Sequence, residues 1–178
     1  MALVVAAYTL PAVAVWTVLG MGLGALPLAA AALVLTAIYA GCFGLQEVAG
    51  RLSLPAPGSR WQVPQTMVLG VSGRRRILVW GAILGPGFRT RNPYAGFGLL
   101  PIVVATAGGV RAAATLAALI GLAHGSGRAL ALLRDARPAA AADPMRLVLT
   151  AMYWRAFDGF ALLVVAGAAM TACAYQLA

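Results

Sequence analysis

The segment from Arg74 to Gly109 is long enough to cross a lipid bilayer, but its middle contains glycines, prolines and two arginines. The interruption reads GPGFRTRNP from Gly85 to Pro93. A helix that faces lipid could not carry this interruption, because unpaired backbone groups and guanidinium groups are costly in hydrocarbon. A broken helix that lines a cavity enclosed by protein could carry it. We therefore expect the rest of the chain to surround this interruption.

The composition places the chain among integral membrane proteins. Of its 178 residues, 62% are hydrophobic and only 10% are charged, and the mean hydropathy is +0.91. These values lie outside the range of soluble globular domains. The net charge of +9 comes from 13 arginines, with no lysine. Because the arginines gather between apolar runs, membrane topology explains them, and we expect no nucleic-acid partner.

The apolar runs predict the membrane spans, since one crossing of the bilayer needs roughly 20 apolar residues. One transmembrane domain over residues 1–178 is expected, with spans at residues 3–22, 26–45, 77–107, 110–133 and 149–175. The third span is broken into half-helices over 77–84 and 94–107, and a polar cytoplasmic loop over 47–76 precedes it. The predicted fold class is all-α, a polytopic integral membrane helical bundle of about five transmembrane helices.

Arginine placement predicts the orientation, because positively charged short loops stay in the cytoplasm. Five arginines lie in the loop before the third span and three in the loop before the fifth, whereas the third link has only Arg111. The pattern predicts a bacterial inner membrane protein with its N-terminus in the cytoplasm and its C-terminus outside. A hairpin that returned to the same side would move the 134–146 loop outside, so we expect a discontinuous crossing.

The expected partners are the bilayer itself and other membrane protein chains. Anionic lipid headgroups are the expected counterions of the arginine triplet Arg74, Arg75 and Arg76 at the mouth of the third span,.

The interruption is the first candidate site. Arg89, Arg91, Asn92 and the start of a half-helix near Tyr94 offer guanidinium forks, an amide and free backbone N–H groups. Such groups favour an anion, so a phosphate, a carboxylate or a sulfur oxyanion is the expected ligand. We expect the Tyr94 hydroxyl inside the protein, bonded to a polar group. In the alternative interpretation, the two arginines extend to a nearby membrane interface.

His124 and Arg128 form a second candidate site, because residues four apart share one helix face,. One histidine excludes a bis-histidine haem or a zinc site built by this chain alone, and a histidine packed against a backbone carbonyl is the alternative. Arg155 and Asp158, three residues apart, are predicted to form a structural ion pair,. No catalytic set and no metal site is predicted, so the enzyme hypothesis is weak.

Cys42 and Cys173 are the only cysteines, and both lie in apolar segments without a CxxC pattern. The expected role is that of two small buried hydrophobic residues. A redox role for the pair is the alternative.

Three elements occur in order from the broken helix onward. They are Pro93-Tyr94-Ala95-Gly96, GLAHGSGRALALL from Gly121, and FDGFALLVVAGAAM from Phe157. This order resembles the transmembrane thiol-disulfide electron carriers of the CcdA and DsbD type, which serve cytochrome c maturation and periplasmic reduction. In that family a Pro-Cys-x-Gly-like element breaks a membrane helix, and Tyr94 stands where the redox cysteine would be. The resemblance implies a bundle around a broken helix whose thiol chemistry is lost or replaced.

Three functions follow as hypotheses from these observations. The leading one is a transporter-like or accessory subunit whose polar interruption engages an anionic group or a partner, with no cofactor. The second is a membrane redox protein that carries electrons through Cys42 and Cys173, or through a bound quinone or haem. The third is a purely structural subunit that uses its glycine-rich faces to join a larger membrane complex.

Overall fold

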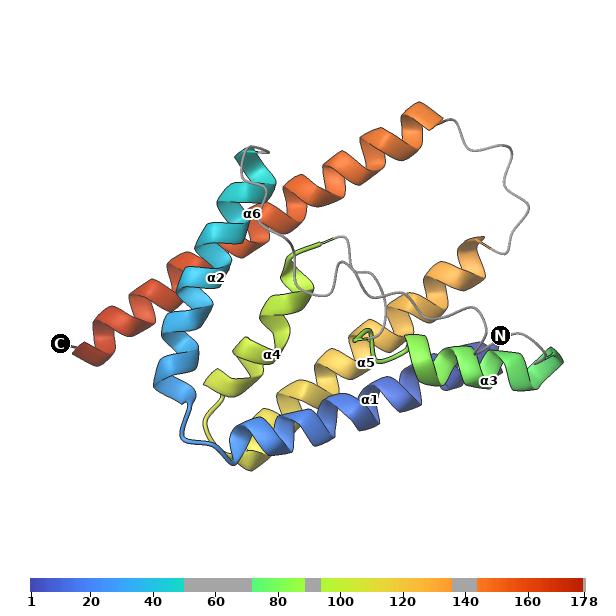
Figure 1. The fold of residues 1–178 in the computed structure, drawn as a ribbon, viewed down its shortest axis with the longest axis horizontal. Helices are drawn as coiled ribbons and strands as arrows, with labels where there is room; N and C mark the ends of the chain where they lie inside the picture. The colour runs from blue at the N-terminus through green and yellow to red at the C-terminus, as the bar shows by residue number, and fades with distance from the viewer. Residues whose placement is uncertain (50–71, 89–93, 136–143, 178) are drawn as a thin grey trace.

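The computed structural model describes residues 1–49, 72–88, 94–135 and 144–177. Over these residues the chain is helical and contains no strand. The described residues form six helices, in chain order (Figure 1): α1 (Ala2–Gly24), α2 (Ala29–Ala49), α3 (Gly73–Leu84), α4 (Gly96–Thr106), α5 (Val110–Asp135) and α6 (Pro144–Leu177).

Four of these helices are long and apolar enough to cross a membrane. They are α1, α2, α5 and α6, whose most apolar stretches have mean hydropathies between 1.5 and 2.0. Large apolar side chains such as Leu10, Ile38, Leu130 and Phe160 point outward from them, as expected for surfaces that face lipid. The prediction of an all-helical membrane bundle is confirmed at this level, and the number of crossings stays a prediction.

The first helix pair consists of α1 and α5, which pack antiparallel through small residues. Gly20 lies against Ala113 and Ala117, whereas Gly121 lies against Ala12. An added Cβ at Gly121 would stand 2.7 Å from the Ala12 carbonyl oxygen, so the two backbones approach too closely for a larger residue,.

The second pair consists of α2 and α6, and α4 lies between the two pairs (Figure 1). Gly41 faces Ala166, whereas Gly44, further along α2, packs against Leu163 and Gly159, so α2 and α6 also run antiparallel. On one side α4 buries Leu99 among residues of α2 and α6. On its other side the buried Val104 contacts a cluster formed by α1 and α5. The short central helix thus supplies core to both pairs.

The predicted half-helices correspond to α3 and α4. Ile77 of α3 packs near Val4, at the beginning of α1. At the end of α4, Ala105 shares a hollow with Leu23 and Leu28, at the other end of α1. The segment therefore begins at one end of α1 and finishes at the other, and the predicted discontinuous crossing of the membrane stays a prediction. We call residues 85–95, between α3 and α4, the break.

The predicted polar loop over 47–76 is too long at both ends. Helix α2 continues through Glu47 to Ala49, and α3 already begins at Gly73. Arg74, Arg75 and Arg76 therefore lie in the first turn of a helix. Glu47 can lie within helix α2, with its side chain only 6% exposed, because the carboxylate has an ionic partner in α6. The local sequence does not show this partner.

Candidate functional site

The beginning of the break is held by side chains from α1 and α5. Trp16 donates a hydrogen bond from its indole Nε1 to the Pro86 carbonyl oxygen at 3.1 Å. Arg128 donates from Nη1 to the Leu84 carbonyl oxygen at 3.3 Å. These two carbonyl groups belong to the end of α3 and the residues just beyond it, where a continuous helix would have supplied backbone N–H donors. Two long side chains from other helices supply donors here, and the Leu84 carbonyl oxygen also accepts from the Gly87 N–H at 3.2 Å.

The end of the break is held by side chains from α2 and α6. The Tyr39 hydroxyl donates to the Ala95 carbonyl oxygen at 2.8 Å. The Gly96 N–H donates to Asp158 Oδ2 at 3.1 Å, and the N–H of Ala95 also interacts with the Asp158 carboxylate. A carboxylate at this position neutralises the positive end of the α4 dipole and binds its free N–H groups.

Each of the four candidate spanning helices thus contributes a hydrogen-bonding side chain to the break. The contributors are Trp16 from α1, Tyr39 from α2, Arg128 from α5 and Asp158 from α6. Non-helical backbone is tolerated at membrane depth only where protein or a polar cavity satisfies it. This convergence explains how the chain keeps an interruption inside an apolar bundle.

His124 packs directly on the break. Gly87 has a φ of +85°, and a Cβ there would collide with His124 Nε2 and with the Phe97 ring. The His124 and Phe97 rings lie 5.0 Å apart, and Phe97 also contacts Trp16 and Phe88. His124 Nε2 is buried without a hydrogen-bond partner among the described residues. The predicted alternative is a packed histidine bonded to a backbone carbonyl group. The ring is packed, but its Nε2 makes no such bond among the described residues.

A cavity of about 410 Å³ lies beside the break, between α4, α5 and α6. Tyr94, His124 and Asp158 are its polar lining residues, and apolar residues of α4 and α6 complete the wall. Its volume is within the roughly 300–1,000 Å³ range of small-molecule sites, which pair apolar walls with a few convergent polar groups. We take this cavity as the candidate functional site.

Some of the predicted site residues lie together at the cavity, and others lie outside the residues that the structure describes. Tyr94 is half-buried and lines the cavity together with His124, while the predicted hydrogen bond of its hydroxyl stays a prediction. Arg128 is used to bind the Leu84 carbonyl group. Arg89, Arg91 and Asn92 lie outside the described residues, so the anion-binding role predicted for them stays a prediction.

The predicted ion pair between Arg155 and Asp158 is replaced by two separate interactions. Arg155 Nε lies 3.6 Å from Glu47 Oε2, whereas Asp158 faces the N–H groups at the start of α4. The reason is the closeness of α2 and α4, which offer each α6 side chain a partner outside its own helix. Glu47 and Asp158, distant in sequence, also interact electrostatically.

The two cysteines are free, and the prediction that both are buried is wrong: Cys42 is exposed and Cys173 is only partly buried. Because Gly41 and Gly44 face Ala166 and Leu163 respectively, Cys42 lies level with about residue 165 of α6. Cys173 lies about eight residues further along, or about 12 Å at the rise of an α-helix. A disulfide needs Cα atoms within about 7 Å, so this packing does not let the two thiols pair within one chain.

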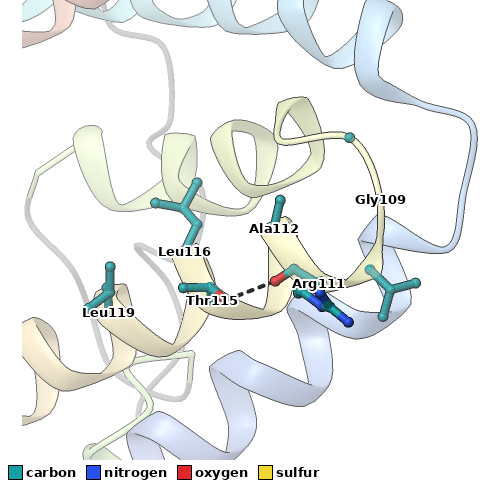
Figure 2. A pocket seen from close by; sticks show the side chains of 8 residues that line it. Gly109, Arg111, Ala112, Thr115, Leu116 and Leu119 are labelled. Atoms are coloured by element: carbon teal, nitrogen blue, oxygen red, sulfur yellow. Dashed lines mark hydrogen bonds between the residues drawn. The ribbon is translucent and has the colours of Figure 1, made fainter.

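A second hollow, of about 700 Å³, lies where the α4–α5 link enters α5. Figure 2 shows its lining, in which the Thr115 hydroxyl donates to the Arg111 carbonyl oxygen at 2.9 Å. Arg111 is the one charged residue of the eight that line it. With no convergent polar side chains around it, this hollow is a weaker candidate than the cavity beside the break.

Comparison with family models, with curated proteins and with solved structures finds no match to this chain. The resemblance to transmembrane thiol-disulfide carriers therefore stays a hypothesis. Within the described ranges, no group of three or more histidine, cysteine, aspartate or glutamate side chains could hold a metal ion.

Proposed function

We propose that this chain is a transporter-like protein of a bacterial inner membrane, whose cavity beside the broken helix binds a small polar solute. The observation that carries the proposal is the convergence of Tyr94, His124 and Asp158 on one cavity at a helix interruption. Broken helices with half-helix ends near the bilayer centre are the usual construction of solute sites in secondary transporters. Buried ionisable residues in a membrane are functional by default, because they are costly to keep.

The purely structural alternative has less support from the packing. Glycine-rich faces were its sequence basis, yet Gly20, Gly121 and Gly125 pack between α1 and α5, and Gly44 and Gly159 pack between α2 and α6. These glycines therefore pack helices of this chain together and do not offer a face to another subunit. The redox alternative needs either a partner chain for each thiol or a bound quinone or haem, and a Soret band in the purified protein would support it.

Water access to the cavity tests the transporter proposal. In a background with Cys42→Ala and Cys173→Ala, Val165→Cys places a thiol at the cavity wall. Val164→Cys is the matched control, because Val164 is 59% exposed on the outer surface of the same helix turn. A charged, membrane-impermeant thiol reagent should label Val165→Cys from either side of oriented vesicles and leave Val164→Cys unlabelled. A cavity sealed from both sides would contradict the proposal, and access from one side only would favour an accessory subunit with a binding site.

The class of solute has its own test. An anion is the expected class because Arg89 and Arg91 belong to the same interruption,. Phosphate, sulfite and a small carboxylate should therefore slow the labelling of Val165→Cys, and Arg89→Gln with Arg91→Gln should abolish this protection. Protection by organic cations instead would identify Asp158 as the residue that selects the solute.

A further inference from the structure

An apolar groove runs along α3, between that helix, α1 and α5. It has a volume of about 450 Å³ and extends from Arg76 to Leu84, about 12 Å at the rise of an α-helix. The residues that line it are Val4, Tyr8, Arg76, Ile77, Trp80, Leu84, Leu132 and Leu133. Hydrophobic side chains thus form most of the wall, and the single charged residue stands at one end.

Positive charge gathers at that end of the groove. Arg76 is exposed, and Arg74 and Arg75 share the first turn of α3, which contains no acidic residue. Arg134, also exposed, lies in the last turn of α5 and directly follows the groove residue Leu133. Guanidinium groups at the positive end of a helix dipole are unfavourable unless an anion neutralises them. The groove therefore combines an apolar length with an anion-binding end.

We propose that this groove binds one acyl chain of an anionic phospholipid, whose phosphate contacts Arg76 and Arg134. A lipid fits both parts of the groove at once, because its chain occupies the apolar walls while its headgroup lies at the arginine end. A free phosphate would satisfy the arginines but leave the walls empty. Basic residues beside transmembrane helices are typical of sites for anionic lipids. This inference is independent of the solute cavity.

Trp80 provides the measurement, because it lines the groove. The protein is reconstituted in bilayers that contain brominated-chain phosphatidylglycerol in one series and brominated-chain phosphatidylcholine in the other. The fluorescence of Trp80 is obtained by subtracting the signal of Trp80→Phe. We expect quenching of Trp80 at several-fold lower fractions of the brominated anionic lipid than of the zwitterionic one.

Charge variants locate the headgroup. Arg76→Gln should weaken the preference of Trp80 for phosphatidylglycerol about fivefold, the effect expected for one arginine near a charged membrane surface. Arg75→Gln is the matched control, since it removes the same charge from the same helix turn at a position that does not line the groove. It should change the preference less than twofold.

Equal quenching by both lipids in the unmodified sequence would overturn the proposal, as would the absence of quenching by either lipid. Equal losses in Arg76→Gln and Arg75→Gln would also overturn it, because they would indicate a diffuse surface charge instead of a site. If Trp80→Phe fails to fold, native mass spectrometry of the unmodified protein decides the matter. Retention of phosphatidylglycerol over phosphatidylcholine in competition is then expected, and retention without preference would refute the proposal.

Discussion

At the scale of single residues, position 87 has the strictest requirement near the site. Gly87 adopts a φ of +85°, which side chains with a Cβ rarely adopt, and His124 and Phe97 occupy the space where that Cβ would lie. Gly87→Ala should lower the free energy of unfolding by about 2 kcal/mol or more, since backbone strain and a steric clash add. Thermal unfolding in detergent, followed by circular dichroism, measures the loss.

Gly22→Ala is the control for this substitution. Gly22 lies inside α1 with nothing within 4 Å of an added Cβ, so alanine there should leave stability unchanged or raise it by up to about 1 kcal/mol. Combining Gly87→Ala with His124→Ala should recover part of the loss by removing one of the clashing groups. If Gly87→Ala were as stable as Gly22→Ala, His124 and Phe97 would not pack on the break as described.

Sequence alone indicated which residue types would be unusual but not which partners they would find. His124, Arg128 and Asp158 stood out because ionisable groups are rare in membrane spans. Trp16 and Tyr39 were missed, although the signal existed: a buried indole N–H or phenol hydroxyl needs an acceptor. Their acceptors, the carbonyl groups of Pro86 and Ala95, lie 70 and 56 residues away in the chain, a distance that only packing can bridge.

At the scale of elements, the start of α4 depends on hydrogen bonds from α2 and α6. Tyr39→Phe keeps the ring packed against Phe43, whose centroid lies 4.4 Å away. It removes the hydroxyl that donates to the Ala95 carbonyl oxygen, which then keeps only the Gly98 N–H as a donor. We expect a loss of about 0.5–1.5 kcal/mol of unfolding free energy, the net contribution of one hydrogen bond, together with faster amide hydrogen exchange around Gly96. Tyr153→Phe is the control, because Tyr153 is 65% exposed, and it should have little effect. Unchanged exchange at Gly96 in Tyr39→Phe would argue against this support of α4.

At the scale of the whole molecule, hydropathy predicted each helix near its observed position, because the period and length of apolar runs are local properties. It did not predict that α4 would supply core to both helix pairs, or that Glu47 would pair with Arg155. Those features arise largely from contacts between segments far apart in the chain, such as Leu99 with Leu162 and Glu47 with Arg155. The resemblance to thiol-disulfide carriers stays a prediction.

The directions of the helices predict on which side of the membrane the C-terminus lies. Because α1 and α5 pack antiparallel, α5 must return to the side on which α1 begins, and α6 must then leave that side again. An N-terminus in the cytoplasm, favoured by the arginines, consequently requires the C-terminus outside and requires α3 and α4 together to cross once.

Reporter fusions test this topology directly. An enzyme active only outside the cytoplasm should function when fused at the C-terminus or inserted at the Gly108–Gly109 link, and should fail when inserted between residues 50 and 71. If α3 and α4 instead returned to their starting side, the C-terminal fusion would be active only with a cytoplasmic reporter, and the antiparallel packing of α1 and α5 could not persist in the membrane.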